Sequence, residues 1–359
     1  MIILLSLSIC ISIVTGAFFW LYSKEIVWWE WCLAPVIATL AATILYFSFT
    51  SLICGDTQTL SGFVVSARYQ PYWVEESTST DSKGRKTTSH TTHYPSWFMT
   101  YSTGHIEEVE IKPNDYVDLY NKFGRKRHAV LGSRPSFDHG DRFDYIVNNE
   151  TNYIQPVVVP KKYINRLKHS TSLFTYKEEK QTIPYPNVTN YFISNRLLGS
   201  AKSQFNQLDF DRMNARLGPM KKVNIIFVGF ASSDNTLGHQ IETQWQGGKK
   251  NDLVICYGKN WAYCFGWTEH DIVKRNLESL FLVPTINNTM LSRIESEVRT
   301  NYILKDWNKF NYVDINFPLW TYIVCIIIMV LIQVLYFIFA LNNNSRKTRK
   351  GFNEYRYRR

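Results

Sequence analysis

Three long apolar runs constrain this chain more than any other feature of its sequence. Residues 2–22 contain no charged side chain, the uncharged run 32–54 follows soon after, and the run 317–341 lies near the other end. A helix of about 20 residues, rising 1.5 Å per residue, crosses the roughly 30 Å of hydrocarbon in a bilayer. We therefore expect an integral membrane protein with transmembrane helices over residues 1–22, 29–54 and 317–341.

The first run has an alternative interpretation as a cleaved signal peptide. Val14 to Ala17 places small residues near its end, as a cleavage site requires. The run lacks the positively charged start that signal peptides usually carry. This comparison favours a retained helix.

Residues near the ends of the runs have the composition of membrane-interface residues. Tryptophan is enriched at the headgroup level of membrane proteins, and the candidates here are Trp20, Trp28, Trp29, Trp31, Trp307 and Trp320. Within the runs, the only ionisable side chains are Cys and Tyr, and Gln333 is the single amide. This composition favours anchoring over conduction, with Gln333 as a contact between helices.

The segment 342–359 carries seven Lys and Arg residues against one acid, Glu354. Such an excess beside a span predicts a cytoplasmic tail, which places the main domain outside the cytoplasm. If the source is a bacterium, the membrane is the inner membrane and the main domain lies in the periplasm. The lipid-headgroup candidates are Arg346, Lys347, Arg349 and Lys350. Because the tail holds most of the net charge of +10, we expect membrane lipid and no nucleic acid as a partner.

Residues 55–190 are rich in Tyr, Val, Thr and Phe, and we expect a β-rich extracytoplasmic domain with strands at 63–69 and 97–101. Between these strands, residues 76–93 are almost entirely polar and predict a mobile loop at a hairpin tip. His90 and His93 lie in that loop. Their spacing does not suit a metal site, so we interpret them as solvated.

In residues 191–310, segments with helical periodicity alternate with short apolar strands, which predicts an α/β sandwich. The expected fold class is therefore a membrane-anchored α+β protein. The expected strands are 223–230, 252–257 and 261–265, with a tight turn at Lys259 and Asn260. The expected helices are 203–217, ended by Gly218 and Pro219, then 237–245, 268–282 with Thr268 as its cap, and one carrying Leu291, Ile294, Val298 and Tyr302.

Within 191–304 this order of elements, followed by a span, resembles the TPM-domain family. The residues that carry the resemblance are Val223–Val228, Trp245–Gly248, Asp252–Ile255, Gly258 and Gly266. It implies a membrane-anchored extracytoplasmic module, of a family in which some members are proposed phosphatases or calcium binders and others assembly factors.

The same resemblance makes Asp234 and Asp252 the candidate metal ligands, with calcium as the ion. Lys249 and Lys250 place positive charge beside Asp252, which opposes cation binding. Calcium also takes six or more oxygens, and two Asp side chains supply few of them. Capping and turn roles are the alternative for both residues.

Cys256 and Cys264 are the cysteines of the soluble body, and two interpretations remain open for them. An oxidising compartment favours a disulfide between them, whereas two small buried side chains are the alternative. A two-residue turn at Lys259 and Asn260 places Cys256 opposite Tyr263, so a bridge requires a bulge or a longer turn.

The chain contains no G-x-S-x-G, H-E-x-x-H or P-loop motif, and we expect neither catalysis nor a required cofactor. The function we expect is interaction with a membrane or extracytoplasmic protein partner, or assembly of a membrane complex. Aromatic residues that suit such contacts, or alternatively a β core, are Tyr69, Tyr72, Trp73 and Trp97. The alternative functions are a metal-dependent, phosphatase-like hydrolase and a subunit of an oligomeric pore.

Overall fold

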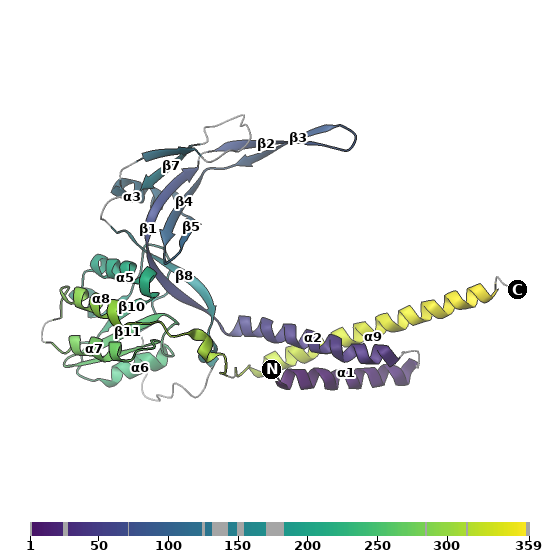
Figure 1. Cartoon of the computed structure of the whole chain (residues 1–359). Helices are drawn as coiled ribbons and strands as arrows, with labels where there is room; N and C mark the ends of the chain where they lie inside the picture. The colour runs from purple at the N-terminus through teal and green to yellow at the C-terminus, as the bar shows by residue number, and fades with distance from the viewer. Residues whose placement is uncertain are drawn as a thin grey trace. The chain divides into compact units, whose positions relative to one another are not determined.

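The protein is an α+β chain with three apolar helices long enough to cross a membrane (Figure 1). The computed structural model describes residues 2–23, 28–70, 72–123, 126–130, 143–148, 154–169, 183–283, 286–313 and 315–356. It divides into two compact units. The helical unit comprises Met1–Asp56, Tyr163–Leu173 and Lys309–Arg359, and the body comprises Thr57–Lys162 and Phe174–Asn308.

The helical unit contains α1 (Ile2–Ser23), α2 (Trp28–Ile53) and α9 (Leu319–Arg356), together with the short 3-10 helix η1 (Arg166–His169). The stretches suited to spanning are Leu4–Leu21, Trp29–Ile53 and Leu319–Asn344, which confirms three apolar helices. One boundary differs from the prediction. The helix of α9 continues past residue 341 to Arg356, and residues 342–356 contain no Pro to end it.

Small residues line the contacts among these three helices. They recur every four positions and are buried: Ser8 and Ser12 on α1, and Ala34, Ala38 and Ala42 on α2. This spacing places them on one helix face, where they allow close packing in a membrane. At Gly16, an added Cβ would lie 3.2 Å from both the Phe337 and the Trp31 rings.

Polar groups link α2 to α9 inside the bundle. The Gln333 side chain is fully buried and its Nε2 donates to Ala34 O at 3.1 Å, which confirms Gln333 as a contact between helices. The Tyr336 hydroxyl donates to Glu30 O at 3.1 Å, and the Asn344 amide donates to the Glu30 carboxylate at 3.1 and 3.2 Å. These bonds satisfy polar groups that lipid would leave unpaired.

Enlarging a buried residue of α2 should loosen the bundle. Ala38 is 1% exposed, and Ala38→Leu inserts three carbons into a packed contact, at a cost of about 1–3 kcal/mol. We expect faster proteolysis and a lower unfolding temperature for the full chain in detergent. Val36, which is 60% exposed on the same helix, provides the control Val36→Leu. Equal effects of the two substitutions would contradict this packing.

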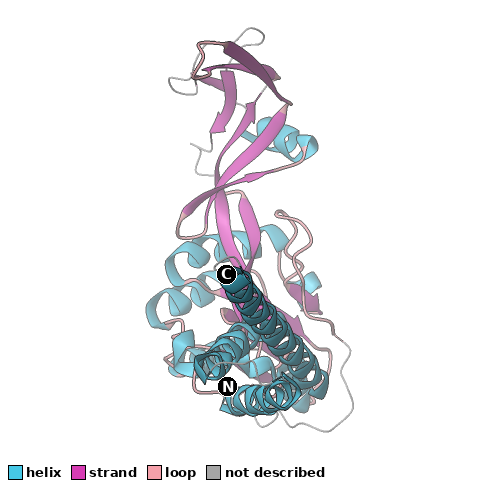
Figure 2. Cartoon of the chain, turned by 90° about the vertical axis from the view of Figure 1, so that its right-hand side faces the viewer, coloured by secondary structure: helices cyan, strands magenta, loops and turns pink. Residues whose placement is uncertain are grey.

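The β half of the body is one curved sheet covered by one helix (Figure 2). Its strand order is β5-β4-β1-β7-β6, and β8 also pairs with β1. The elements are β1 (Gly55–Gln70), β4 (Ser96–Ser102), β5 (Ile106–Glu110), α3 (Pro113–Phe123), β6 (Lys126–Val130), β7 (Phe143–Asn148) and β8 (Pro156–Ile164). The sequence-based interpretation missed α3, although Tyr116, Leu119 and Phe123 form its buried face at helical spacing.

A separate hairpin, β2 (Trp73–Thr80) with β3 (Lys86–His93), extends the β1–β4 pair. The pair Gln70–Ser96 joins β1 to β4, and the pair Trp73–His93 joins β2 to β3 in the same antiparallel register. The predicted hairpin is confirmed, but the prediction of a loop over the whole of 76–93 is wrong, since these residues form paired strands through Thr80 and Lys86. Their Thr residues favour extended backbone although the segment is polar.

The α/β half contains a four-stranded sheet in the order β12-β11-β10-β9. Its strands are β9 (Leu197–Gly199), β10 (Asn224–Gly229), β11 (Asp252–Gly258) and β12 (Trp261–Gly266). Its helices are α4 (Ala201–Gln204), α5 (Gln207–Lys221), α6 (Thr236–Gln244), α7 (Ile272–Leu280) and α8 (Met290–Asn301), followed by the 3-10 helix η2 (Trp307–Phe310). The central strand β10 is buried throughout and lies parallel to β9 and β11.

Helices cover both faces of this sheet. One core cluster joins Phe227 and Ile255 to α5, α7 and α8, and the other joins Ile226 and Val254 to α6. Two helix boundaries differ from the prediction. Pro219 lies in the last turn of α5, and α7 begins at Ile272 because Thr268 instead forms a bridge to Leu304.

Candidate functional site

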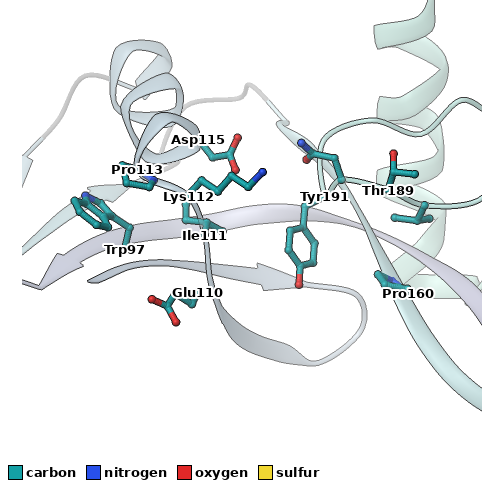
Figure 3. A pocket seen from close by; sticks show the side chains of 11 residues that line it. Trp97, Glu110, Ile111, Lys112, Pro113, Asp115, Pro160, Thr189 and Tyr191 are labelled. Atoms are coloured by element: carbon teal, nitrogen blue, oxygen red, sulfur yellow. The ribbon is translucent and has the colours of Figure 1, made fainter. Parts of the chain in front are cut away.

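A pocket of about 620 Å³ opens in the β half of the body (Figure 3). It lies where β4, the end of β5 and the first turn of α3 meet the segment 188–191 and Pro160 of β8. Its apolar lining is formed by Trp97, Ile111, Pro113, Pro160, Val188 and Tyr191. A pocket of this size and lining is typical of a binding site for a small molecule or a protein side chain.

Backbone hydrogen bonds hold the two sides of the pocket in place. Ile111 N donates to Trp97 O at 2.8 Å, which ties the end of β5 to β4. Val158 N donates to Tyr191 O at 2.8 Å, which ties the segment 188–191 to β8. The Trp97 ring stacks on Tyr69 of β1 with centroids 5.4 Å apart. The pocket therefore has a rigid apolar floor that belongs to the core of the β half.

Three charged residues, Glu110, Lys112 and Asp115, line the rim of the pocket. Within the described residues none of the three has an ion-pair partner. Pro113 begins α3, and Asp115 lies in its first turn, where the helix dipole favours negative charge. These side chains can therefore form ion pairs with a ligand without first breaking an ion pair within the described part of the protein.

The strand β5, which leads into the pocket, is an edge strand of the sheet. Its outer edge presents backbone groups that pair with no described strand, and such edges accept added strands. The strand carries Glu107, Glu108 and Glu110. Arg68 donates two hydrogen bonds to Glu108, at 2.6 and 2.8 Å, and lowers the pKa of that carboxyl. The edge is therefore acidic.

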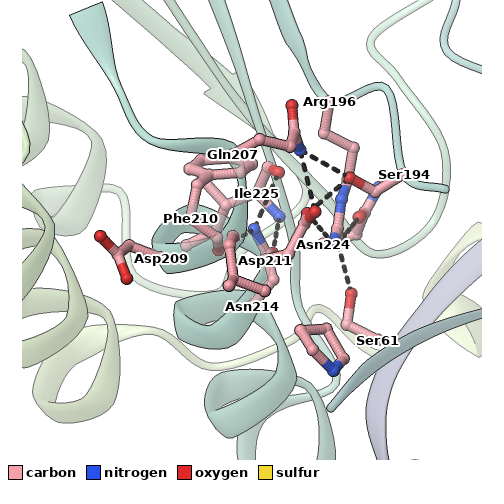
Figure 4. Close-up of polar contacts among 12 residues, drawn as sticks. Ser61, Ser194, Arg196, Gln207, Asp209, Phe210, Asp211, Asn214, Asn224 and Ile225 are labelled. Atoms are coloured by element: carbon pink, nitrogen blue, oxygen red, sulfur yellow. Dashed lines mark hydrogen bonds and ion pairs between the residues drawn. The ribbon is translucent and has the colours of Figure 1, made fainter. Parts of the chain in front are cut away.

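A second polar feature is a buried cluster centred on Arg196, which is 1% exposed (Figure 4). Its guanidinium donates to Asp211 Oδ1 at 2.9 Å, to Asn224 Oδ1 at 3.0 Å and to Ser61 Oγ at 2.6 Å. Ser194 and Gln207 donate to the Asp211 carboxylate as well. A buried charge requires pairing and hydrogen bonds. Arg196 has them at Nη1 and Nη2, whereas its buried Nε has no hydrogen-bond partner among the described residues.

This cluster joins the two halves of the body. Ser61 belongs to β1, whereas Arg196, Asp211 and Asn224 belong to the α/β half. A second bond across the same contact runs from Asn251 Nδ2 to Thr59 O at 2.6 Å. The Arg196 cluster is therefore a structural contact that holds β1 against the α/β half.

Removal of the Arg196 guanidinium should destabilise the body strongly. Arg196→Met leaves the Asp211 carboxylate buried beside no cation, which costs about 3–5 kcal/mol. We expect faster hydrogen exchange at the β10 and β11 amides of the full chain. The control is Arg299→Met, which breaks an exposed pair with Glu295 and should cost at most about 0.5 kcal/mol. Comparable losses would show that the buried cluster contributes no more than a surface pair.

The structure does not bring Asp234 and Asp252 together. Asp252 begins β11, whereas Asp234 follows the end of β10, where its carboxylate accepts from Thr236 N at 2.9 Å in the turn before α6. Because β10 and β11 are parallel, these positions lie at opposite ends of the sheet. Their pairing as metal ligands is therefore wrong, and no cluster of three His, Cys, Asp or Glu in the described residues is arranged to hold a metal ion.

Asp252 has a structural role instead. Its fully buried carboxylate accepts from Asn224 Nδ2 and the Tyr185 hydroxyl, both at 2.8 Å, and from Lys249 N at 2.7 Å. Burial raises its pKa above the ordinary value of 3.8, and these hydrogen bonds partly oppose the shift. The carboxylate fixes the turn before β11, which agrees with the turn role that we kept as the alternative.

The raised pKa makes stability depend on pH. Above pH 3.8 the unfolded chain releases the Asp252 proton while the folded chain keeps it, so the free energy of unfolding falls as pH rises. The slope is at most about 1.4 kcal/mol per pH unit and ends above the raised pKa. We expect Asp252→Asn to lack this slope in urea titrations across pH. Asp234→Asn controls for the loss of one carboxylate, and an unchanged slope in Asp252→Asn would contradict the assignment.

Of the two interpretations left open for Cys256 and Cys264, the structure agrees with two small buried side chains, because both cysteines are free and buried. Cys256 lies opposite Tyr263, as the two-residue turn predicts, so Cys264 lies opposite Ile255. Side chains alternate along a strand, and the two thiols therefore pack in different cores on opposite faces of the sheet. Burial raises the pKa of both thiols, which makes them unreactive.

The other predicted site residues lie on the helical unit, except Trp307, which lies in the body. Trp20, Trp29 and Trp320 are 48%, 45% and 50% exposed on the helical unit, as an outward-facing aromatic belt requires. Trp31 lies against Gly16, and Trp307 packs edge to face on Trp267 at 5.7 Å in the body. The side chains of Trp28 and of Arg346, Lys347, Arg349 and Lys350 lie outside the described residues.

Of the pocket residues, the sequence indicated only Trp97, as one of several aromatic residues suited to contacts. His90 and His93, interpreted as solvated, lie on β3 and contact Glu76 and Glu75 at 2.9 and 3.2 Å. No protein-family model, no curated protein and no solved structure matches this chain.

Proposed function

We propose that this protein is a multi-pass membrane protein whose body binds a membrane or extracytoplasmic protein partner during assembly of a membrane complex. The observation that carries the proposal is the apolar pocket at the end of the free, acidic edge of β5. A rigid apolar pocket with a charged rim suits an anchoring side chain of a protein partner.

The occupant that fits this site is an extended, basic segment of the partner. Such a segment adds as a strand to β5 through main-chain hydrogen bonds, and its side chains give specificity. Glu107 and Glu110 along β5 favour Lys or Arg in the partner, whereas Glu108 is already paired with Arg68. Where β5 ends, Trp97 and Ile111 offer the apolar pocket to the next large side chain.

The membrane topology is part of the proposal. The basic residues of 342–359 favour a cytoplasmic C-terminus, with the body outside the cytoplasm and the tail at the lipid headgroups. The packing of α1, α2 and α9 through small residues supports three spans that form one anchor.

A TPM-like identity for residues 191–304 also belongs to the proposal. The resemblance rests on the order of elements along the chain, which is α5, β10, α6, β11, β12, α7 and α8. The free cysteines and the separated Asp234 and Asp252 favour a module for assembly over one for metal-dependent hydrolysis.

Photo-crosslinking in native membranes tests the pocket. A photoreactive residue at Val188 of the full chain should crosslink to one main protein partner, and the same probe at Ile272, 53% exposed on α7, should not. Val188→Asp places a charge in the apolar lining and should reduce co-purification of that partner about tenfold or more, which corresponds to about 1.4 kcal/mol. Ile272→Asp is the matched control. Equal capture from both probe positions, or an equal loss with both substitutions, would contradict the assignment.

A further inference from the structure

The β2–β3 hairpin, here called the arm, has two free edges. It forms a sheet of its own, so the outer edges of β2 and β3 pair with no described strand. At about 3.4 Å per residue its eight-residue strands span about 27 Å. A two-stranded hairpin is marginally stable in water by itself, and unpaired edges are templates for another strand.

Charge is distributed unevenly along the arm. Its base carries Glu75 and Glu76, which contact His93 and His90 across the hairpin. Its tip carries Lys83, Arg85 and Lys86, all exposed, against a single acid. That acid, Asp81, accepts from Lys83 N at 2.8 Å and Arg85 N at 2.9 Å and so fixes the turn. The arm is therefore acidic at the base and basic at the tip.

We propose that the arm is a self-association element, which pairs edge to edge with the arm of a second copy of this chain. In an antiparallel pair the acidic base of each arm meets the basic tip of the other, and a two-fold axis creates this contact twice. A parallel pair would instead place tip beside tip and base beside base, with like charges in contact.

The polarity of the arm explains why the partner is a strand and not an apolar surface. From Ser77 to Thr92 the described side chains are Ser, Thr and charged or His residues apart from Gly84, and β3 is exposed along nearly its whole length. Backbone hydrogen bonds and complementary charge are then the interactions that remain.

Charge reversal at each end of the arm tests the proposal with the full chain in detergent. The tip variant carries Lys83→Glu, Arg85→Glu and Lys86→Glu, and the base variant carries Glu75→Lys and Glu76→Lys. Analytical ultracentrifugation should find wild-type dimers and, for each variant alone, dimerisation weakened about tenfold or more. High salt should weaken the wild-type dimer as well. The control reverses three exposed charges on the α/β half, with Lys202→Glu, Lys259→Glu and Arg275→Glu, and should leave the dimer intact.

Restored dimerisation between complementary variants distinguishes a loss of charge complementarity from damage to the hairpin itself. An equimolar mixture of the tip and base variants should form heterodimers, and one chain with both reversals should dimerise again, because base and tip are then complementary. A monomeric wild type would overturn the proposal. Dimers that persist in the tip and base variants, or a mixture that stays monomeric, would overturn it as well.

Discussion

The desolvated guanidinium of Arg196 is the contact on which the body of this protein depends. Its hydrogen bonds reach Ser61 on β1, Asp211 on α5 and Asn224 at the start of β10. A cation in a protein interior needs hydrogen-bond partners, so the bonds of its Nη1 and Nη2 atoms fix the relative position of these three elements. A Cβ at Gly218 would lie 2.1 Å from Ser61 O, which shows how closely α5 packs on the same strand.

The pocket follows from this arrangement because its two sides come from different parts of the body. Trp97 and Ile111 lie on the sheet that β1 organises, whereas Tyr191 leads into the chain segment that carries Arg196. Val158 N and Tyr191 O join the two sides. Arg196 therefore lies close along the chain to one side of the pocket, whose rim is charged.

The contacts among α1, α2 and α9 and the free edges of the arm differ in chemistry. Between α1, α2 and α9, small residues permit close van der Waals packing, and few polar bonds are needed. The arm offers the reverse, an open backbone edge with complementary charge and hardly any apolar surface. Neither surface has the mixed composition of an ordinary globular domain. Both therefore stood out in the sequence, the helices as long apolar runs and the arm as an almost entirely polar segment.

Composition and periodicity by themselves determined the three apolar helices, the buried strand β10 and the hairpin at Lys259 and Asn260, since each depends on local patterns. The two-residue turn even fixed Cys256 opposite Tyr263. Only the tertiary structure decided that Cys264 faces another core, that Asp234 and Asp252 lie at opposite ends of a parallel pair, and that Arg196 joins distant segments. These outcomes depend on strand direction, face and long-range burial. A linear sequence does not display those quantities, because they arise when segments far apart in the chain exclude water together.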